Sequence, residues 1–208
     1  MFSRHELAWL GGAGWQAALA RALPGQHAAI EQWWREDWPA IVRRADPGLE
    51  PGRVSLGIAL PSRGRVALNA HVSDIARRKS PLALGEATKA APARWRAALD
   101  ELAAESDGMA MHVYGSLAMQ TLTGQEYMGP DSDIDLLFFP ANRGALDAGL
   151  ALLERYSAVL PLDGEIVFPS GDAVAWKEWL NADRVMVKDA VTVRLAPAAA
   201  LLATLEAP

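Results

Sequence analysis

The chain has 208 residues, of which 51% are hydrophobic, and its formal net charge is −5 at pH 7. This length and hydrophobic content suffice for one large domain or two small ones with a buried core. The acidic balance argues against a protein that binds nucleic acid through a broad basic face. Because the sequence contains no cysteine, disulfides, thiolate catalysis and cysteine zinc sites are excluded.

No uninterrupted apolar run reaches the length of a membrane span, and the start, MFSRHELAWLGG, lacks the features of a secretory signal. We therefore expect a cytoplasmic protein that neither crosses a membrane nor binds nucleic acid.

The N-terminal part of the chain predicts a small α+β module. Residues 30–38 (IEQWWREDW) favour a helix that ends before Pro39, and three apolar stretches after it predict short strands, namely PAIVRR, VSLGIAL and RVALNAHV. Residues 80–92 contain two prolines and one glycine, as is typical of a linker. We accordingly predict two domains, 1–80 and 81–208, with the boundary near residue 80.

Helices and strands alternate over the rest of the chain. The pattern predicts helices over 93–105, 117–122, 143–160, 174–180 and 197–205, strands ending at 114 and over 134–139 and 162–168, and a hairpin of VMVK and VTVRL. Together with the first module, this alternation predicts an α+β fold.

Residues 112–139 carry the pattern that indicates a function. The first apolar run ends at Gly115 and Ser116 before a helix, so backbone N–H groups and the serine hydroxyl would face an anion. In the next run Asp133 and Asp135 are two residues apart, so on a strand both carboxylates leave the same face. Mg²⁺ prefers carboxylate and phosphate oxygens. The stretch therefore predicts a phosphate site beside a metal site, and we expect two Mg²⁺ ions.

A third carboxylate is expected from residues 162–168 (LDGEIVF), where Asp163 and Glu165 share one face of a strand. Glu165 lies deeper in the apolar run, where an unpaired charge would cost more. Glu165 is therefore the preferred metal ligand, and Asp163 stays open as the alternative.

Several cations invite a role, each with a simpler alternative. Lys177, Lys188 and Arg194 could bind phosphate groups, or they could be ordinary solvated surface residues. Lys188 is the most suggestive because it interrupts an apolar strand. The run from Arg77 to Lys79 could dock an acidic protein partner or form part of a solvated linker.

The order of strand, Gly-Ser, helix, Asp-x-Asp strand and acidic strand resembles the nucleotidyltransferase fold of the polymerase-beta type. That likeness implies a mixed sheet with flanking helices. The sixteen residues between Ser116 and Asp133 are more than that fold usually has. The extra segment, 123–132, is expected to shape a substrate pocket.

Motifs along nearly the whole chain are similar to the MdcG family, the phosphoribosyl-dephospho-CoA transferases of malonate decarboxylase, which act as its holo-acyl-carrier-protein synthases. The likeness is carried by RHELAWL, WPAIVRR, LGIALP, VYGSLAMQTLTG, SDIDLLF, LDGEIVF and AWKEWL. It implies that triphosphoribosyl-dephospho-CoA is the donor and a serine of the apo acyl-carrier subunit the acceptor, with release of diphosphate. It also implies that Asp133 and Asp135 are the catalytic pair. We assign the N-terminal domain to recognition of the acceptor or the substrate.

Two alternatives stay open. A small-molecule nucleotidyltransferase, such as one that modifies an antibiotic, would use the same acidic strand. A non-catalytic module of the same fold would bind a nucleotide or a partner, although it would not need a costly pair of carboxylates.

Overall fold

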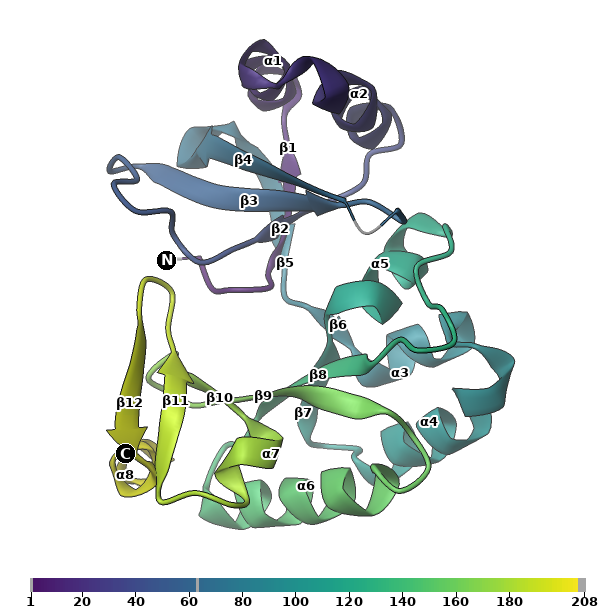
Figure 1. The fold of residues 1–208 in the computed structure, drawn as a ribbon, viewed down its shortest axis with the longest axis vertical. Helices are drawn as coiled ribbons and strands as arrows, with labels where there is room; N and C mark the ends of the chain where they lie inside the picture. Colours follow the sequence, from purple (N-terminus) through teal and green to yellow (C-terminus); the bar gives the residue numbers. More distant parts are fainter. Residues whose placement is uncertain (1, 63, 206–208) are drawn as a thin grey trace. The chain divides into compact units, whose positions relative to one another are not determined.

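The structure is a computed structural model that describes residues 2–62 and 64–205. The chain divides into two compact units, Met1–Pro81 and Leu82–Pro208, both visible in Figure 1. Each unit has its own sheet and its own helices, so the α+β fold class is confirmed.

The first unit is built on a five-stranded antiparallel sheet in the order β4-β3-β2-β1-β5. Its strands are β1 Leu7–Leu10, β2 Ala40–Val42, β3 Arg53–Ala59, β4 Arg65–His71 and β5 Ile75–Lys79. Helices α1 (Gly12–Arg21) and α2 (His27–Arg35) lie together against one face of this sheet (Figure 1), and short 3₁₀ turns occur at η1 Pro24–Gln26 and η2 Val72–Asp74. Buried and exposed residues alternate along β4, as expected for a strand with one face on a core.

Two sequence predictions for this unit are wrong in detail. The helix expected over 30–38 lies three residues earlier, over His27–Arg35, because Asp37 adopts a left-handed conformation (φ 52°) that a helix cannot continue through. Arg77, Arg78 and Lys79 belong to strand β5 rather than to a linker, and they pair with β1.

The second unit contains a seven-stranded sheet in the order β12-β11-β10-β9-β8-β7-β6. Its strands are β6 Leu82–Ala83, β7 Ala110–Val113, β8 Ile134–Phe139, β9 Leu162–Val167, β10 Ala173–Ala175, β11 Arg184–Lys188 and β12 Val193–Pro197. Strands β8 and β9 run parallel and the other neighbouring pairs run antiparallel, so the sheet is mixed.

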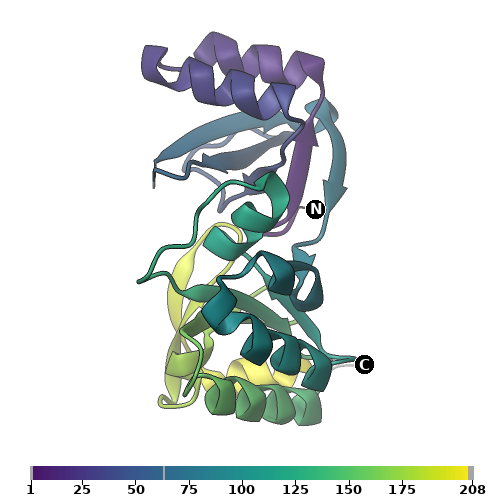
Figure 2. The same ribbon diagram turned by 90° about the vertical axis from the view of Figure 1, so that its right-hand side faces the viewer.

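Helices α4 (Ala93–Glu105) and α6 (Arg143–Tyr156) lie side by side along one face of this sheet, as Figure 2 shows. The apolar residues of β8 and β9 that point to this face are buried, for example Leu136 and Ile166. Phe138 fits against α6 at Gly149, where a Cβ atom would collide with its ring. The acidic residues of β8 and β9 therefore belong to the opposite face.

The remaining elements of this unit correct the sequence predictions at three points. The expected linker over 80–92 contains β6, α3 (Leu84–Ala87) and η3 (Thr88–Ala90). The helix expected over 174–180 is only α7 (Trp176–Trp179), because Ala173–Ala175 pairs with β9 as a strand. Helix α5 covers Gly115–Thr123, two residues earlier than expected, and α8 covers Ala198–Leu205.

None of the helices that the structure describes has the length and hydrophobicity needed to cross a bilayer.

Candidate active site

The Gly-Ser pair forms the first turn of helix α5, directly after strand β7 and Tyr114. Gly115 has φ 64°, a conformation that favours glycine, and a Cβ atom there would collide with the carboxylate of Asp135. The backbone N–H of Tyr114 donates to the main-chain oxygen of Asp135 at 3.0 Å. The start of α5 and the carboxylate of Asp135 are therefore in direct contact.

This contact places the start of a helix, which attracts anions, beside the Asp135 carboxylate, which attracts cations. The first backbone N–H groups of a helix have no partner within the helix and attract anions. A phosphate bound at this helix start would lie close to the Asp135 carboxylate and be repelled by it. A cation between the two would turn that repulsion into attraction, which is the arrangement that divalent metals support.

Strand pairing determines which other carboxylates lie beside Asp135. In the parallel pair of β8 and β9, Asp135 is the register partner of Asp163, and Leu137 is the partner of Glu165. Asp133 comes directly before β8 and is exposed, and Asp135 and Asp163 are half-buried. Since register partners in adjacent strands point to the same face, Asp135 and Asp163 share one face at the start of these strands.

Glu165 is in a different environment. Its side chain is 5% exposed, and its Oε1 accepts a hydrogen bond from Nζ of Lys188 at 2.9 Å. Lys188 lies on β11, opposite Ala173 of β10, and its side chain reaches across to β9. The pair explains the lysine in an otherwise apolar strand, because the ammonium group neutralises a buried carboxylate.

Lys177 lies nearer to the other acidic residue of β9. Its Nζ is 3.8 Å from Oδ1 of Asp163, and both side chains are about half exposed, at 55% and 49%. An exposed pair at this distance is weak, so Lys177 can exchange this partner for a phosphate at little cost. Arg194, in contrast, binds Asp172 through two hydrogen bonds of 3.0 and 2.9 Å.

Within residues 2–62 and 64–205, no group of three or more histidine, cysteine or acidic side chains is already assembled as a metal cage. The donor type at Asp133, Asp135 and Asp163 nevertheless suits Mg²⁺, which binds through one or two carboxylates and completes its shell with substrate phosphates and water. By donor type these three carboxylates therefore fit Mg²⁺.

The long segment between α5 and β8 is held by specific contacts. Oε1 of Gln120 accepts hydrogen bonds from the backbone N–H groups of Tyr127 and Met128, both at 2.9 Å, and its Nε2 donates to the main-chain oxygen of Ala90. Ser132 accepts from the N–H of Gly129 at 2.8 Å. The segment is thus an ordered structure that leads into Asp133.

Tyr127 in this segment stays protonated over the physiological range. Burial raises the pKa of its phenol to about 12, and a hydrogen bond with Thr123 only partly opposes that shift. No pattern in the sequence distinguishes this tyrosine from the others.

Sequence reasoning also missed Gly164, which lies between the two acidic residues of β9. Its φ is 136°, and a Cβ atom there would collide with the backbone of Leu136 in β8. Glycine thus allows β8 and β9 to approach closely where Asp135 and Asp163 are paired. The glycine between two acidic residues of a predicted strand was the sequence signal that could have indicated this close approach.

Comparison with known proteins assigns both units to one family. Two family models match, described as the N-terminal domain of phosphoribosyl-dephospho-CoA transferase MdcG, over residues 3–81, and its C-terminal domain, over residues 82–199.

Curated relatives named phosphoribosyl-dephospho-CoA transferase match over most of the chain. One from Xanthomonas campestris pv. campestris (strain 8004) is 39% identical over 209 residues, covering 97% of both chains. One from Bradyrhizobium diazoefficiens is 38% identical over 84% of this chain and 80% of the relative, and one from Pseudomonas aeruginosa is 34% identical over 73% and 74%. No solved structure matches. The chain belongs to the MdcG family of phosphoribosyl-dephospho-CoA transferases.

Proposed function

We propose that this protein transfers a phosphoribosyl-dephospho-CoA group from its triphosphate precursor to a serine of the apo acyl-carrier subunit of malonate decarboxylase. The observation that carries this proposal is the contact between the Asp135 carboxylate and the start of α5 at Gly115, with Asp163 as the register partner. Membership of the MdcG family supports the same donor. The fold proposed for the second unit is that of a polymerase-beta-like nucleotidyltransferase.

In the proposed reaction the serine Oγ attacks the α-phosphorus of the precursor. A new P–O bond forms to the serine, the bond from the α-phosphorus to the diphosphate oxygen breaks, and the serine proton is released. The first turn of α5, with the Ser116 hydroxyl, binds phosphate oxygens. Bound Mg²⁺ would lower the pKa of the attacking hydroxyl and stabilise the departing diphosphate.

The metal ligands proposed are Asp133, Asp135 and Asp163. Asp163 is preferred to Glu165 because it is the register partner of Asp135, whereas Glu165 is buried and already neutralised by Lys188. Lys177, which lies 3.8 Å from Asp163, is the cation best placed to contact a phosphate of the precursor.

Intact-mass spectrometry of the carrier tests the proposal. The full chain is incubated with Mg²⁺, triphosphoribosyl-dephospho-CoA and the apo carrier subunit. The carrier should gain one phosphoribosyl-dephospho-CoA group, and one diphosphate should appear per carrier. A carrier whose acceptor serine is replaced by alanine, and a reaction with EDTA, serve as controls and should show no gain.

The same assay separates the alternatives. Turnover of ATP without any carrier, together with an unmodified carrier, would favour a small-molecule nucleotidyltransferase. The absence of both turnover and metal-dependent triphosphate binding would favour a non-catalytic module.

A further inference from the structure

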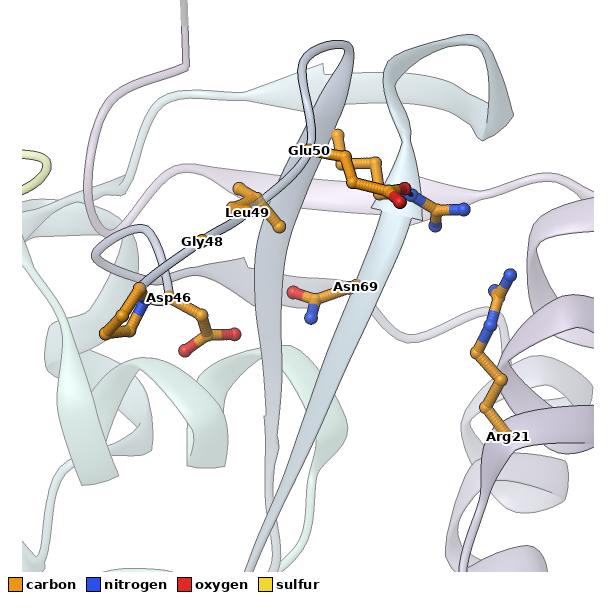
Figure 3. Close-up of a pocket in the computed structure, with 8 residues that line it drawn as sticks. Arg21, Asp46, Gly48, Leu49, Glu50 and Asn69 are labelled. Atoms are coloured by element: carbon orange, nitrogen blue, oxygen red, sulfur yellow. Dashed lines mark hydrogen bonds and ion pairs between the residues drawn. The ribbon is translucent and has the colours of Figure 1, made fainter.

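The first unit contains a pocket of about 410 Å³ that the proposed chemistry does not use. Its wall consists of Arg21, Asp46, Pro47, Gly48, Leu49, Glu50, Arg53 and Asn69. Figure 3 shows Arg21 rising from α1 on one side, the loop with Asp46, Gly48, Leu49 and Glu50 on the other, and Asn69 on the strand between them. The volume lies within the range of pockets that bind small organic ligands.

The loop that forms one wall is built from two consecutive Pro-Gly turns of the same design. The N–H of Leu49 donates to the oxygen of Asp46 at 3.1 Å, and the N–H of Arg53 donates to the oxygen of Glu50 at 3.2 Å. Gly48 and Gly52 have φ 74° and 78°, as a type II turn requires at its third position. Proline restricts the loop further, so this wall exists before a ligand arrives.

The acidic residue of the first turn is already neutralised. Arg43 donates to both carboxylate oxygens of Asp46, at 3.1 and 2.8 Å, and the buried Ser55 hydroxyl lies 3.1 Å from Oδ2. With its amide nitrogen turned toward the carboxylate, Asn69 donates to the same oxygen at 3.1 Å. Burial raises the pKa of Asp46, but the hydrogen bonds from Arg43, Ser55 and Asn69 outweigh it, so the net shift is downward. Asp46 therefore carries a charge that its neighbours balance.

The two arginines of the pocket have fewer hydrogen-bond partners than Asp46 has. Arg53 is 16% exposed, and Glu50 binds it only through Nε, at 2.8 Å. Among the residues that the structure describes, none accepts a hydrogen bond from the terminal nitrogens of Arg53 or from the side chain of Arg21. The pocket thus offers two guanidinium groups in a chain whose net charge is −5.

We propose that this pocket binds a nucleotide, with its phosphate between the guanidinium groups of Arg21 and Arg53 and its base and sugar against Pro47 and Leu49. Guanidinium groups bind phosphate through paired, charge-assisted hydrogen bonds. The side chains of Pro47 and Leu49 add an apolar contact that a nucleotide can make and a free phosphate ion cannot. The inference goes beyond the proposed function, because it concerns a pocket of the first unit alone, and dephospho-CoA serves here as one test nucleotide.

Calorimetry on the full chain tests this binding. AMP, dephospho-CoA, inorganic phosphate and an aspartate-rich peptide are titrated in EDTA into the Asp135→Asn variant, so that the metal-dependent site of the second unit does not contribute. AMP and dephospho-CoA should bind to one site, and inorganic phosphate should bind at least tenfold more weakly. Hydrogen exchange should slow over residues 46–53 when either nucleotide is bound.

Arg21→Gln should weaken AMP binding by about tenfold to a hundredfold, the value of one charge-assisted contact. Arg35→Gln is the matched control, because Arg35 also ends a helix, is exposed and lies outside the pocket. It should bind AMP as the parent does.

The proposal is overturned if neither nucleotide binds, if Arg21→Gln binds as tightly as Arg35→Gln, or if only the acidic peptide binds, which would indicate a protein partner instead. These results are independent of transfer to the carrier. A chain that binds AMP through Arg21 but modifies no carrier would contradict the proposed function alone.

Discussion

Strand β9 carries two acidic residues two positions apart, and the two side chains lie in different environments. Asp163 is half exposed, lies beside Asp135 and is only loosely approached by Lys177, whereas Glu165 is buried and bound to Lys188. The comparison teaches that burial alone does not identify a catalytic carboxylate. A buried acid in a strand can be a structural charge pair, while its more exposed neighbour keeps the freedom to bind a metal.

The largest expected effect comes from the carboxylate at the start of β8. Asp135→Asn should lower the rate of carrier modification by about a thousandfold, since a metal that stabilises the transition state contributes several kcal/mol. Circular dichroism and thermal unfolding should match the parent. An asparagine variant with near-parental rates would remove Asp135 from the chemistry.

Gly115→Ala tests whether the carboxylate needs its place against the helix start. The new methyl group would displace the Asp135 side chain, so the rate should fall about a hundredfold, for roughly 3 kcal/mol of lost transition-state stabilisation. Gly124→Ala is a matched control, because Gly124 has φ 69° at the other end of the same helix and no atom within 4 Å of a new Cβ. Both variants should lose about 1–2 kcal/mol of stability from backbone strain. Equal activities would show that the contact with Asp135 has no catalytic importance.

Substitutions in β9 test the difference between Asp163 and Glu165, because one should affect activity and the other stability. Glu165→Gln should destabilise the fold by about 2 kcal/mol, because Lys188 would keep a partly buried charge without its carboxylate. Asp163→Asn should change stability by less than about 0.5 kcal/mol and still reduce transfer. Urea unfolding of both variants, with a Glu165→Gln and Lys188→Met double-mutant cycle, measures the coupling.

The coupling should exceed about 1 kcal/mol if Glu165 and Lys188 stabilise each other. Additive losses would mean that the pair has no structural importance, and Glu165 would regain its place as a candidate ligand.

The smallest expected effect is on stability and concerns Asp189, in the turn between β11 and β12. Hydrogen bonds from the side chain and backbone of Thr192 and from the N–H of Val191, together with nearby Arg194, lower the pKa of Asp189 to about 2. The folded pKa is below the unfolded value of about 3.9, so this stabilisation is present above pH 4 and is lost as pH falls toward 2. Asp189→Ala should therefore lower the melting temperature at pH 6 more than at pH 2.5. An equal difference at both pH values would contradict the account.

Local patterns in the sequence were enough to predict much of the fold. The strand at 134–139 and the helix over 93–105 appear as predicted, because the first is a short apolar run that follows turn residues and the second has a helical apolar pattern over thirteen residues. The short elements between residues 80 and 92 could not be predicted, since tertiary packing rather than local propensity holds a two-residue strand and single helical turns.

The candidate site likewise has a part that local sequence patterns predict and a part that they do not. The Gly-Ser and Asp-x-Asp patterns are local, and they predicted a close approach that the structure shows at Gly115 and Asp135. The partners of Lys188 and Arg194 depend on which strands pair across the sheet. No spacing in the sequence encodes that pairing, so the lysine could be taken equally well for a phosphate ligand.

Divalent-metal binding tests the central claim most directly. Mn²⁺, which accepts the same oxygen ligands as Mg²⁺, is titrated in the presence of the triphosphate precursor and followed by electron paramagnetic resonance. Asp133→Asn, Asp135→Asn and Asp163→Asn should each weaken Mn²⁺ binding, and Glu165→Gln should bind it as the parent does. Loss of binding in Glu165→Gln with full binding in Asp163→Asn, or unchanged binding in all four variants, would contradict the account.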